Sequence, residues 1–474
     1  MDRRDSSKYK KLARIALAFV LLLIFSSSIY AQHSFFSVNE LHISGNNKTK
    51  QKTILRELNF KQGDKIISSS LNARLEENKL NLFNTGLFNH VSITAVDSTG
   101  TIKIALEERW FWFAIPVFEL ADRNFNVWWT EQDRDWERTK YGFNLLRYNM
   151  RGRNETLSTG IRWGYNRKLI LDYEFPFIDK KKILGLIFSS HYYADRELGI
   201  RTTDNKWEFN RSNSFNNSRF HFGFSISRRK KLNSTHYLQL FYQHNTINDS
   251  IQLIAPDYFS TESNTQRFVR AAYVFEHDER DVKKYPTKGY YLRAKLDKRG
   301  LGLFNDVDLL FGEIHGSLYQ PISDALIVSA SAKYRRTLSG NSSYNQENRL
   351  GFLETQVRGY EYYIVEAPHF LLGKLNFRQV ILKREWRNPL STKDQFRRIP
   401  IAIYFKLHQE IAWTQGRADP LNPLNDSFLS GTGIGLELFT WYDMQMSIDY
   451  SWNHRGENGL YLHFNTTWDY WKIR

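Results

Sequence analysis

The 474-residue chain contains no cysteine. This absence excludes disulfide bonds, metal clusters built on thiolates and a lipid-modified cysteine anchor. The chain also has only one long apolar run, from Ile15 to Phe25, which is shorter than the ~20 residues that a membrane-spanning helix needs. If the protein is embedded in a membrane, it does not cross it with helices.

That apolar run has the features of an export signal. Basic residues between Lys8 and Arg14 precede it, and the small residue Ala31 offers a cleavage point after it. The sequence therefore predicts a signal peptide over residues 1–31, which is removed on export. A retained membrane anchor is the alternative.

Motifs of catalysis are also missing. The sequence has no G-x-S-x-G elbow and no H-E-x-x-H pair, and its 13 histidines are scattered. We therefore predict no enzyme, no catalytic residues, and no metal or cofactor site.

The formal net charge is +16. Nucleic acid is the usual partner of such a charge, but an exported chain rarely meets nucleic acid. Anionic lipid head groups are the better candidate, and we expect no nucleic-acid partner.

Residues 36–108 differ in pattern from all that follows. The segment VNELHISGN predicts a short strand, and KTKQKTILRELNF has apolar residues at helical spacing. A second helix has Leu71, Leu75 and Leu82 on one stripe and ends at Gly86. The segments HVSITAV and TIKIALEE then alternate as two strands, so the order is strand, helix, helix, strand, strand.

This order resembles a POTRA domain, as do the SGN after the first strand and the LFNTGLFNHV that closes the second helix. The resemblance implies a periplasmic domain that binds extended polypeptide by adding it to a sheet edge. Another kind of small α+β domain is the alternative.

Residues 109–474 alternate with a period of two. In DMQMSIDYSWN and RFHFGFSIS, apolar and aromatic residues alternate with small or polar ones. A soluble sandwich has such strands too, but here the segments run to about ten residues or more, the aromatic share is 15% and the apolar faces often end in Trp or Tyr. We therefore predict a mainly β protein in which a transmembrane antiparallel barrel follows the POTRA domain.

The alternation and the turn residues predict sixteen strands, an even number as bacterial barrels require. They are expected near residues 110–120, 139–149, 154–165, 167–175, 183–194, 215–228, 234–247, 266–277, 289–297, 306–319, 325–336, 367–381, 398–412, 430–440, 443–453 and 459–470. The inner turns are strongly basic, which favours a ring facing anionic head groups; a solvated charged face is the alternative.

One inner turn carries a pattern of its own. Asp278, Arg280 and Asp281 are followed by Pro286 and Gly289, and the acidic pair can accept hydrogen bonds from turn amides. A well-made turn explains this much. The pattern D-x-R-D followed by P-x-x-G also resembles the turn of the BamA/TamA superfamily of outer-membrane assembly and secretion barrels.

A second motif resembles the same superfamily. Val357, Arg358, Gly359 and Tyr360 lie in the long segment 337–366, between two predicted strands. The resemblance implies that this is the sixth outer loop and that its tip folds back into the barrel lumen.

A guanidinium in a lumen is costly to bury unless it is paired. By alternation Glu410 points inward, and the resemblance implies that it is the partner of Arg358. In relatives that carry it, a second acid lies on the preceding predicted strand. Asn376 stands at the matching position in this sequence, so one charge is missing. Glu437, also inward, could compensate. An Arg358 solvated in a wet lumen is the alternative.

Near the end of the chain, Gly459, Leu462 and Phe464 give the glycine, apolar, aromatic order that resembles the sorting signal on the last strand of outer-membrane barrels. The chain continues beyond this order, so the terminal register stays open.

The resemblance implies a function at the outer membrane of a diderm bacterium, with the POTRA domain in the periplasm. Members insert outer-membrane proteins or pass unfolded polypeptides across the membrane. The implied partners are unfolded clients, outer-membrane lipids and accessory periplasmic or lipoprotein subunits. Two alternatives remain: a dedicated two-partner secretion pore and a passive structural or pore-forming barrel.

Overall fold

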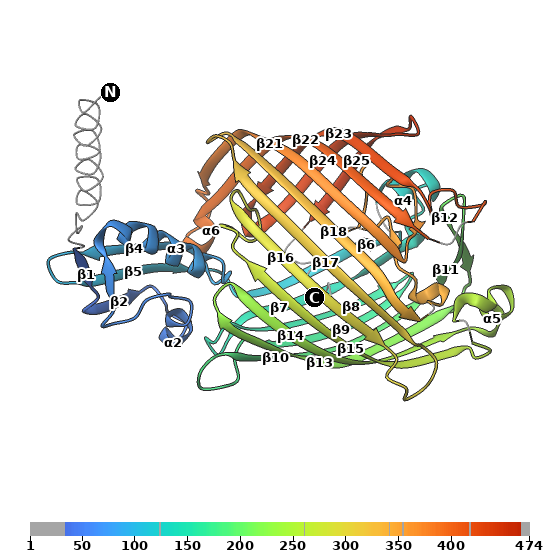
Figure 1. Ribbon diagram of the computed structural model, residues 1–474, viewed down its shortest axis with the longest axis horizontal. Helices are drawn as coiled ribbons and strands as arrows, with labels where there is room; N and C mark the ends of the chain where they lie inside the picture. The colour runs from blue at the N-terminus through green and yellow to red at the C-terminus, as the bar shows by residue number, and fades with distance from the viewer. Residues whose placement is uncertain are drawn as a thin grey trace, which may run out of the picture.

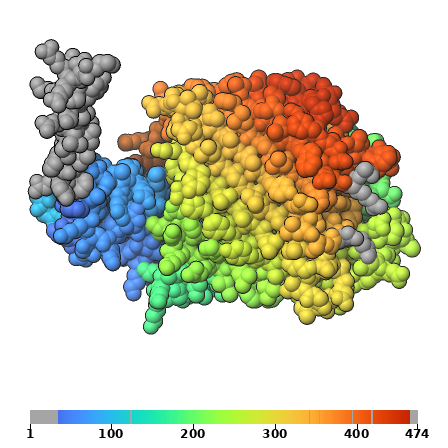
Figure 2. Space-filling model, in the orientation of Figure 1, coloured from blue at the N-terminus to red at the C-terminus, as the bar shows by residue number. Residues whose placement is uncertain are grey.

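The computed structural model describes residues 34–122, 125–259, 261–340, 342–352, 355–416 and 419–465. The predicted signal peptide over residues 1–31 therefore lies outside the described residues. A small N-terminal domain lies against one end of a large β-barrel (Figure 1). The space-filling view shows the domain packed directly on that end (Figure 2).

The N-terminal domain contains two helices and two small sheets. Its elements are β1 (Phe35–Ser37), β2 (Glu40–Ser44), α2 (Gln51–Leu55), β3 (Lys65–Ile67), η1 (Ser68–Ser70), α3 (Leu71–Phe83), β4 (Phe88–Val96) and β5 (Thr101–Glu108). Strand β5 lies between β2, which is parallel to it, and β4, which is antiparallel. The predicted stripe of Leu71, Leu75 and Leu82 on α3 is buried in the core against these strands. The β1–β3 pair was not predicted, because its strands have only three residues each.

The barrel is a 16-stranded antiparallel sheet, so the predicted strand number is confirmed. Neighbours in the sheet follow the order of the chain, and β6 and β25 are its two end strands. The strands are β6 (Trp112–Leu120), β7 (Thr139–Met150), β8 (Glu155–Gly164), β9 (Arg167–Phe175), β10 (Leu184–Asp195), β13 (Asn217–Lys231), β14 (Ser234–Ile247), β15 (Thr265–Asp278), β16 (Gly289–Arg299), β17 (Leu309–Pro321), β18 (Leu326–Gly340), β21 (His369–Arg387), β22 (Arg398–Gln415), β23 (Phe428–Thr440), β24 (Met444–Asn453) and β25 (Asn458–Asn465).

The two faces of the barrel wall differ as the period of two requires. On β13, Phe220, Phe222 and Phe224 are exposed on the outside, whereas His221 and Ser225 are buried inside. The outer face is thus apolar and the lumen face polar, as in barrels that stand in lipid.

Among the described residues, no helix is both long and apolar enough to cross a membrane.

The longest loops all join the strands at the end away from the N-terminal domain, called the outer end here (Figure 1). The loops contain α4 (Phe125–Glu131), η2 (Trp136–Arg138), β11 (Glu197–Thr203), β12 (Lys206–Arg211), α5 (Asp249–Ile254), η3 (Pro256–Tyr258), η4 (Tyr344–Gln346), β19 (Arg349–Leu350) and β20 (Val365–Glu366); the inner turns contain α6 (Asp394–Arg397) and η5 (Trp441–Asp443).

Candidate functional site

The loop between β18 and β21 folds back into the barrel. Val357 and Tyr360 are only 2% exposed and pack in an apolar cluster with residues of the barrel wall. The approach to β23 is so close that a Cβ on Gly431 would lie 1.7 Å from the carbonyl oxygen of Arg358. Only glycine leaves room for the loop at this point of the wall.

Arg358 lies between two carboxylates on different strands. Its Nη1 is 2.7 Å from Asp449 Oδ2 on β24, and its Nε is 3.7 Å from Glu410 Oε1 on β22. The backbone N–H of Arg358 also donates to Glu410 Oε2 at 3.0 Å. Lys374 on β21 lies 3.1 Å from the same carboxylate. The loop tip is therefore tied to the wall by charge and by a backbone hydrogen bond.

The other expected lumen partners lie further along the wall. Glu437 on β23 accepts from Tyr285 Oη at 2.7 Å and pairs with Lys406 at 3.1 Å. Asn376 lies on β21 directly opposite His408 of β22. The second carboxylate in direct contact with Arg358 is Asp449, which was not in the expected set, whereas Glu437 is in direct contact with Lys406.

Sequence reasoning missed Asp449, although a signal was present. The alternation in DMQMSIDYSWN places Asp449 on the polar face of its strand. Its side chain is completely buried and also lies 2.8 Å from Lys406. An acid in the middle of a strand, on the face that points into the lumen, was the clue.

The same loop binds the last hairpin of the barrel. Gly359 O accepts from Asn453 Nδ2 at 2.8 Å, and Tyr363 Oη donates to Glu457 Oε1 at 2.6 Å. Tyr360 Oη and His454 Nδ1 are 2.5 Å apart. The loop therefore connects β22 to the β24–β25 hairpin from inside the lumen.

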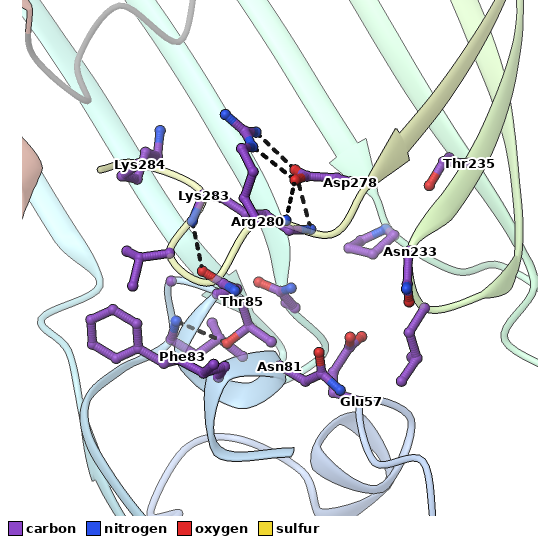
Figure 3. Close-up of a pocket in the computed structure, with 18 of the residues that line it drawn as sticks. Glu57, Asn81, Phe83, Thr85, Asn233, Thr235, Asp278, Arg280, Lys283 and Lys284 are labelled. Carbon is purple, nitrogen blue, oxygen red and sulfur yellow. Dashed lines mark hydrogen bonds and ion pairs between the residues drawn. The ribbon is translucent and has the colours of Figure 1, made fainter. Parts of the chain in front are cut away.

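The turn between β15 and β16 is held by its two acids (Figure 3). Asp278 binds the guanidinium of Arg280 through both oxygens, each at 2.8 Å. Asp281 Oδ1 accepts from the backbone N–H groups of Thr287 and Lys288 at 2.9 and 3.1 Å. These are the hydrogen bonds from turn amides that the residue types suggest.

Pro286 and Gly289 shape the return of this turn into β16. Gly289 has φ +100°, and a Cβ there would lie 2.1 Å from Glu279 O. Pro286 O accepts from Arg378 Nη2 at 2.5 Å, so the turn reaches into the lumen mouth.

The tip of this inner turn contacts the end of helix α3 of the N-terminal domain (Figure 3). Asn84 Nδ2 donates to Asp281 O at 2.8 Å, and Asn84 Oδ1 accepts from Lys283 N at 3.0 Å. A cavity of about 840 Å³ lies between the domain and the mouth of the barrel; its lining includes Asn81 and Asp278.

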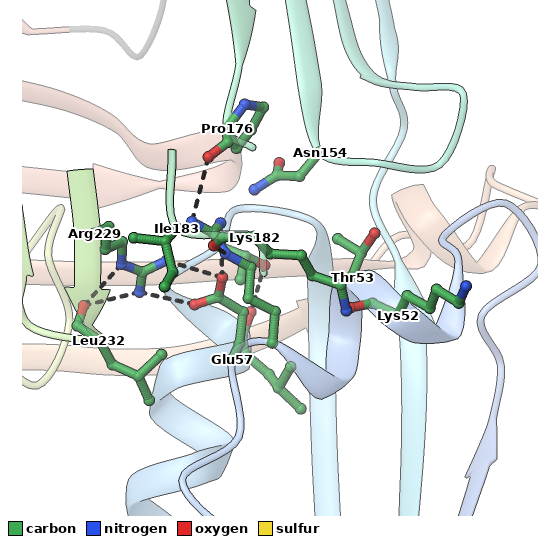
Figure 4. A network of polar contacts seen from close by, with 12 residues as sticks. Lys52, Thr53, Glu57, Asn154, Pro176, Lys182, Ile183, Arg229 and Leu232 are labelled. Carbon is green, nitrogen blue, oxygen red and sulfur yellow. Dashed lines mark hydrogen bonds and ion pairs between the residues drawn. The ribbon is translucent and has the colours of Figure 1, made fainter. Parts of the chain in front are cut away.

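Glu57 makes a buried contact between the domain and the barrel (Figure 4). Its carboxylate is 4% exposed and binds both terminal nitrogens of Arg229, at 2.9 and 2.8 Å. Burial alone would raise the pKa of Glu57, but the charge and hydrogen bonds of Arg229 outweigh it and hold the pKa below its usual value. The neighbouring Arg56 donates from Nε to Lys182 O at 2.9 Å and from Nη2 to Pro176 O at 3.3 Å.

Further contacts surround the mouth of the barrel. Thr53 Oγ1 donates to Gly152 O at 2.9 Å, Asn89 Nδ2 donates to Gln395 O at 3.1 Å, and Arg109 pairs with Asp443 at 3.0 Å. The domain thus contacts the inner turns that follow β7, β9, β15, β21 and β23. It also contacts the inner end of β13, where Arg229 lies. Basic residues of these turns, such as Arg229, bind the domain, whereas the sequence suggested that they face lipid head groups.

The expected sorting residues lie on β25. Leu462 faces Ile448 and Phe464 faces Met446 across the β24–β25 pair. Phe464 is 56% exposed on the outer face, and Gly459 makes room for the ring of Tyr461, which is buried in the lumen.

Within the described ranges, no group of three or more His, Asp or Glu residues is arranged to hold a metal ion.

Comparison with known proteins adds two family matches. Residues 36–109 match the POTRA family, described as surface antigen variable number repeat, and residues 149–366 match the Omp85 superfamily domain. No curated protein matches the chain.

Two solved structures are similar in fold. BamA from Haemophilus ducreyi lacking POTRA domains 1–3 has 14% identity and a TM-score of 0.50, with 90% of this chain and 83% of that chain covered. CdiB from Escherichia coli has 10% identity and a TM-score of 0.56, with 90% of this chain and 75% of that chain covered.

Proposed function

Because the chain belongs to the Omp85 superfamily of outer-membrane barrels and carries one POTRA domain, we propose that it inserts unfolded polypeptide clients into the outer membrane. The barrel lies in that membrane and the POTRA domain lies in the periplasm. The resemblance to assembly and secretion barrels favours insertion or translocation of polypeptides. The choice of insertion rests on the structure of the lumen.

The lumen offers a poor path to a client. The loop that carries Arg358 is packed against β22, β23 and β24 inside the barrel. At the inner end, the POTRA domain binds turns on several sides of the mouth, among them those at Gly152, Arg229 and Asp443. Two independent obstacles therefore lie on the straight route through the barrel.

The two end strands offer a better path. Strand β6 has nine residues and is among the shorter strands of the barrel wall, and β25 is described over eight residues, up to Asn465. In a barrel with this strand order they face each other. Opening that junction exposes unpaired backbone groups to lipid, each at a cost of several kcal/mol, and a client strand that pairs with the free edge recovers those hydrogen bonds. This is the observation that carries the proposal.

Photocrosslinking in cells tests it, with a crosslinking amino acid at Leu460 on the outer face of β25. We expect crosslinks to many different nascent barrel proteins. Leu318 on β17 is the matched control, because it is exposed on the same outer face, at 54% against 60% for Leu460, but far from the end strands. Equal yields from both positions would contradict insertion at this junction.

A dedicated secretion pore is the second candidate, and the single POTRA domain favours it, because the family resemblance implies that the central assembly factor carries several. A crosslinker at Asn376 in the lumen distinguishes the two functions. One large partner at Asn376, with none at Leu460, would support secretion. Steady ion conductance in planar bilayers without client, and no crosslinks at either position, would support a passive pore.

A further inference from the structure

The loop that joins β6 to β7 is rich in exposed aromatic residues. Phe118, near the end of β6, is 61% exposed, and Trp136 in η2 is 65% exposed; their ring centroids are 6.1 Å apart. Phe118 belongs to the outer face of β6, which also exposes Ala114 and Pro116. The contact between Phe118 and Trp136 therefore joins the apolar outer face of β6 to this loop.

The aromatic surface extends along helix α4. Trp136 packs edge-on against Trp128 at 5.0 Å, Trp128 contacts Phe125 at 5.8 Å, and Phe125 stacks on Trp129 at 5.5 Å. Trp129 is 45% exposed. We call the set Phe118, Phe125, Trp128, Trp129 and Trp136 the aromatic cap.

Helix α4 has two different faces. Phe125 and Trp129 are four residues apart and share one face. Val127 and Glu131, on the opposite side of the helix, line a cavity of about 470 Å³ on the inner side, where Glu131 pairs with Lys206 at 3.0 Å. Val127 and Glu131 thus face the cavity, and Phe125 and Trp129 lie on the other side of the helix.

The helix also reaches the other end strand of the barrel. Asn126 Nδ2 donates to Leu460 O of β25 at 2.8 Å, and α4 lies beside the outer end of β25 in the ribbon view (Figure 1). Since the loop is covalently attached to β6, this hydrogen bond links the two end strands at the outer end of their junction.

We propose that the aromatic cap is a lipid-binding surface that lies in the head-group layer of the outer leaflet, and that Asn126 of the same helix holds β6 and β25 together there. Tryptophan is enriched at this depth because its ring has an apolar body and a polar edge. Arg134 lies over the ring of Trp129 at 4.3 Å, which places a guanidinium beside the rings, where it can bind anionic groups of a lipid head group. The partner is the outer leaflet itself, because the cap continues the lipid-facing surface of β6.

Spin labelling of the whole protein in lipid bilayers tests the depth of the cap. The absence of native cysteine means that Trp129→Cys and Trp136→Cys each carry one label. We expect severalfold more collision with oxygen, and less with a water-soluble nickel complex, than at Leu253→Cys. Leu253 is the matched control, since it is an apolar side chain, 82% exposed, on α5 in another outer loop.

Labels at 129 and 136 that are as accessible to the nickel complex as the label at 253 would overturn the proposal. Labels shielded from both reagents would overturn it as well, because they would indicate a protein partner. The result does not depend on client handling, so a failure here leaves the proposed function untouched.

The link between the end strands has its own test. Asn126→Ala removes the hydrogen bond to Leu460, and we expect faster hydrogen exchange in the backbone of β25. Thr130→Ala is the control, because Thr130 bonds only within its own helix, to Asn126 O. Unchanged exchange in β25 of Asn126→Ala would show that helix α4 does not hold the two strands together.

Discussion

Arg358 binds carboxylates from two strands that are not neighbours in the sheet. Asp449 and Glu410 come from β24 and β22, which are separated by β23. A buried guanidinium is tolerated only when its charge is compensated. The loop tip thus fixes the relative positions of three adjacent strands from inside.

Asp449→Asn should therefore weaken the barrel. The change keeps the shape of the side chain but leaves both Arg358 and Lys406 short of a carboxylate in a buried place, at a cost of about 3 to 5 kcal/mol. Urea unfolding of the refolded protein in detergent measures the loss. Glu385→Gln is the control, because its pair with Arg398 is exposed and such pairs contribute at most about 1 kcal/mol; equal midpoints for the two variants would contradict the expectation.

At the scale of elements, the contact between the POTRA domain and the inner turns depends on a close approach at Gly152. A Cβ there would lie 2.3 Å from Lys48 O of the domain, in a turn residue with φ +72°. Gly152→Ala should push the domain away from the turn after β7 and make the link between Glu108 and Trp112 more sensitive to protease. Limited proteolysis followed by mass spectrometry measures this.

Gly456→Ala separates this effect from backbone strain. Gly456 has φ +82°, so alanine costs a similar strain there, yet nothing lies within 4 Å of its added Cβ. Equal protease sensitivity in the two variants would show that the approach to Lys48 does not matter.

At the scale of the whole molecule, attachment of the POTRA domain to the barrel should depend on pH. Arg56, Arg229 and Lys283 surround Glu57, and its pKa is lowered in the attached state. A group with a lowered pKa stabilises the attached state above its free pKa, and the stabilisation disappears as the pH falls through the lowered value. We expect the attachment to weaken as the pH falls below the usual pKa of a glutamate, measured as rising protease sensitivity of the link. Glu57→Gln should show weaker attachment at neutral pH and little further change in acid; a wild-type pH profile in this variant would contradict the role of Glu57.

The sequence predicted the wall of the barrel well and the contacts across the lumen less well. A period of two is a local property, so strand number and inward-facing positions could be read directly. Which inward acid meets Arg358 depends on the path of the loop through the lumen, and alternation alone could not choose between Glu437 and Asp449. Arg229 binds Glu57 because the POTRA domain lies against the inner end of the barrel. The sequence of a turn does not specify where that domain lies.

The distribution of POTRA contacts along the chain also has a consequence for the order of folding. The partners of the domain are spread from Gly152 on the turn after β7 to Asp443 on the turn after β23. Contacts of such high sequence separation form late, because long loops must first be closed. The POTRA domain has a core of its own and is made first, yet it cannot complete its attachment until nearly the last hairpin has joined the sheet. Attachment of the domain therefore marks the completion of the barrel, and until then the surface that binds the turns stays exposed to solvent.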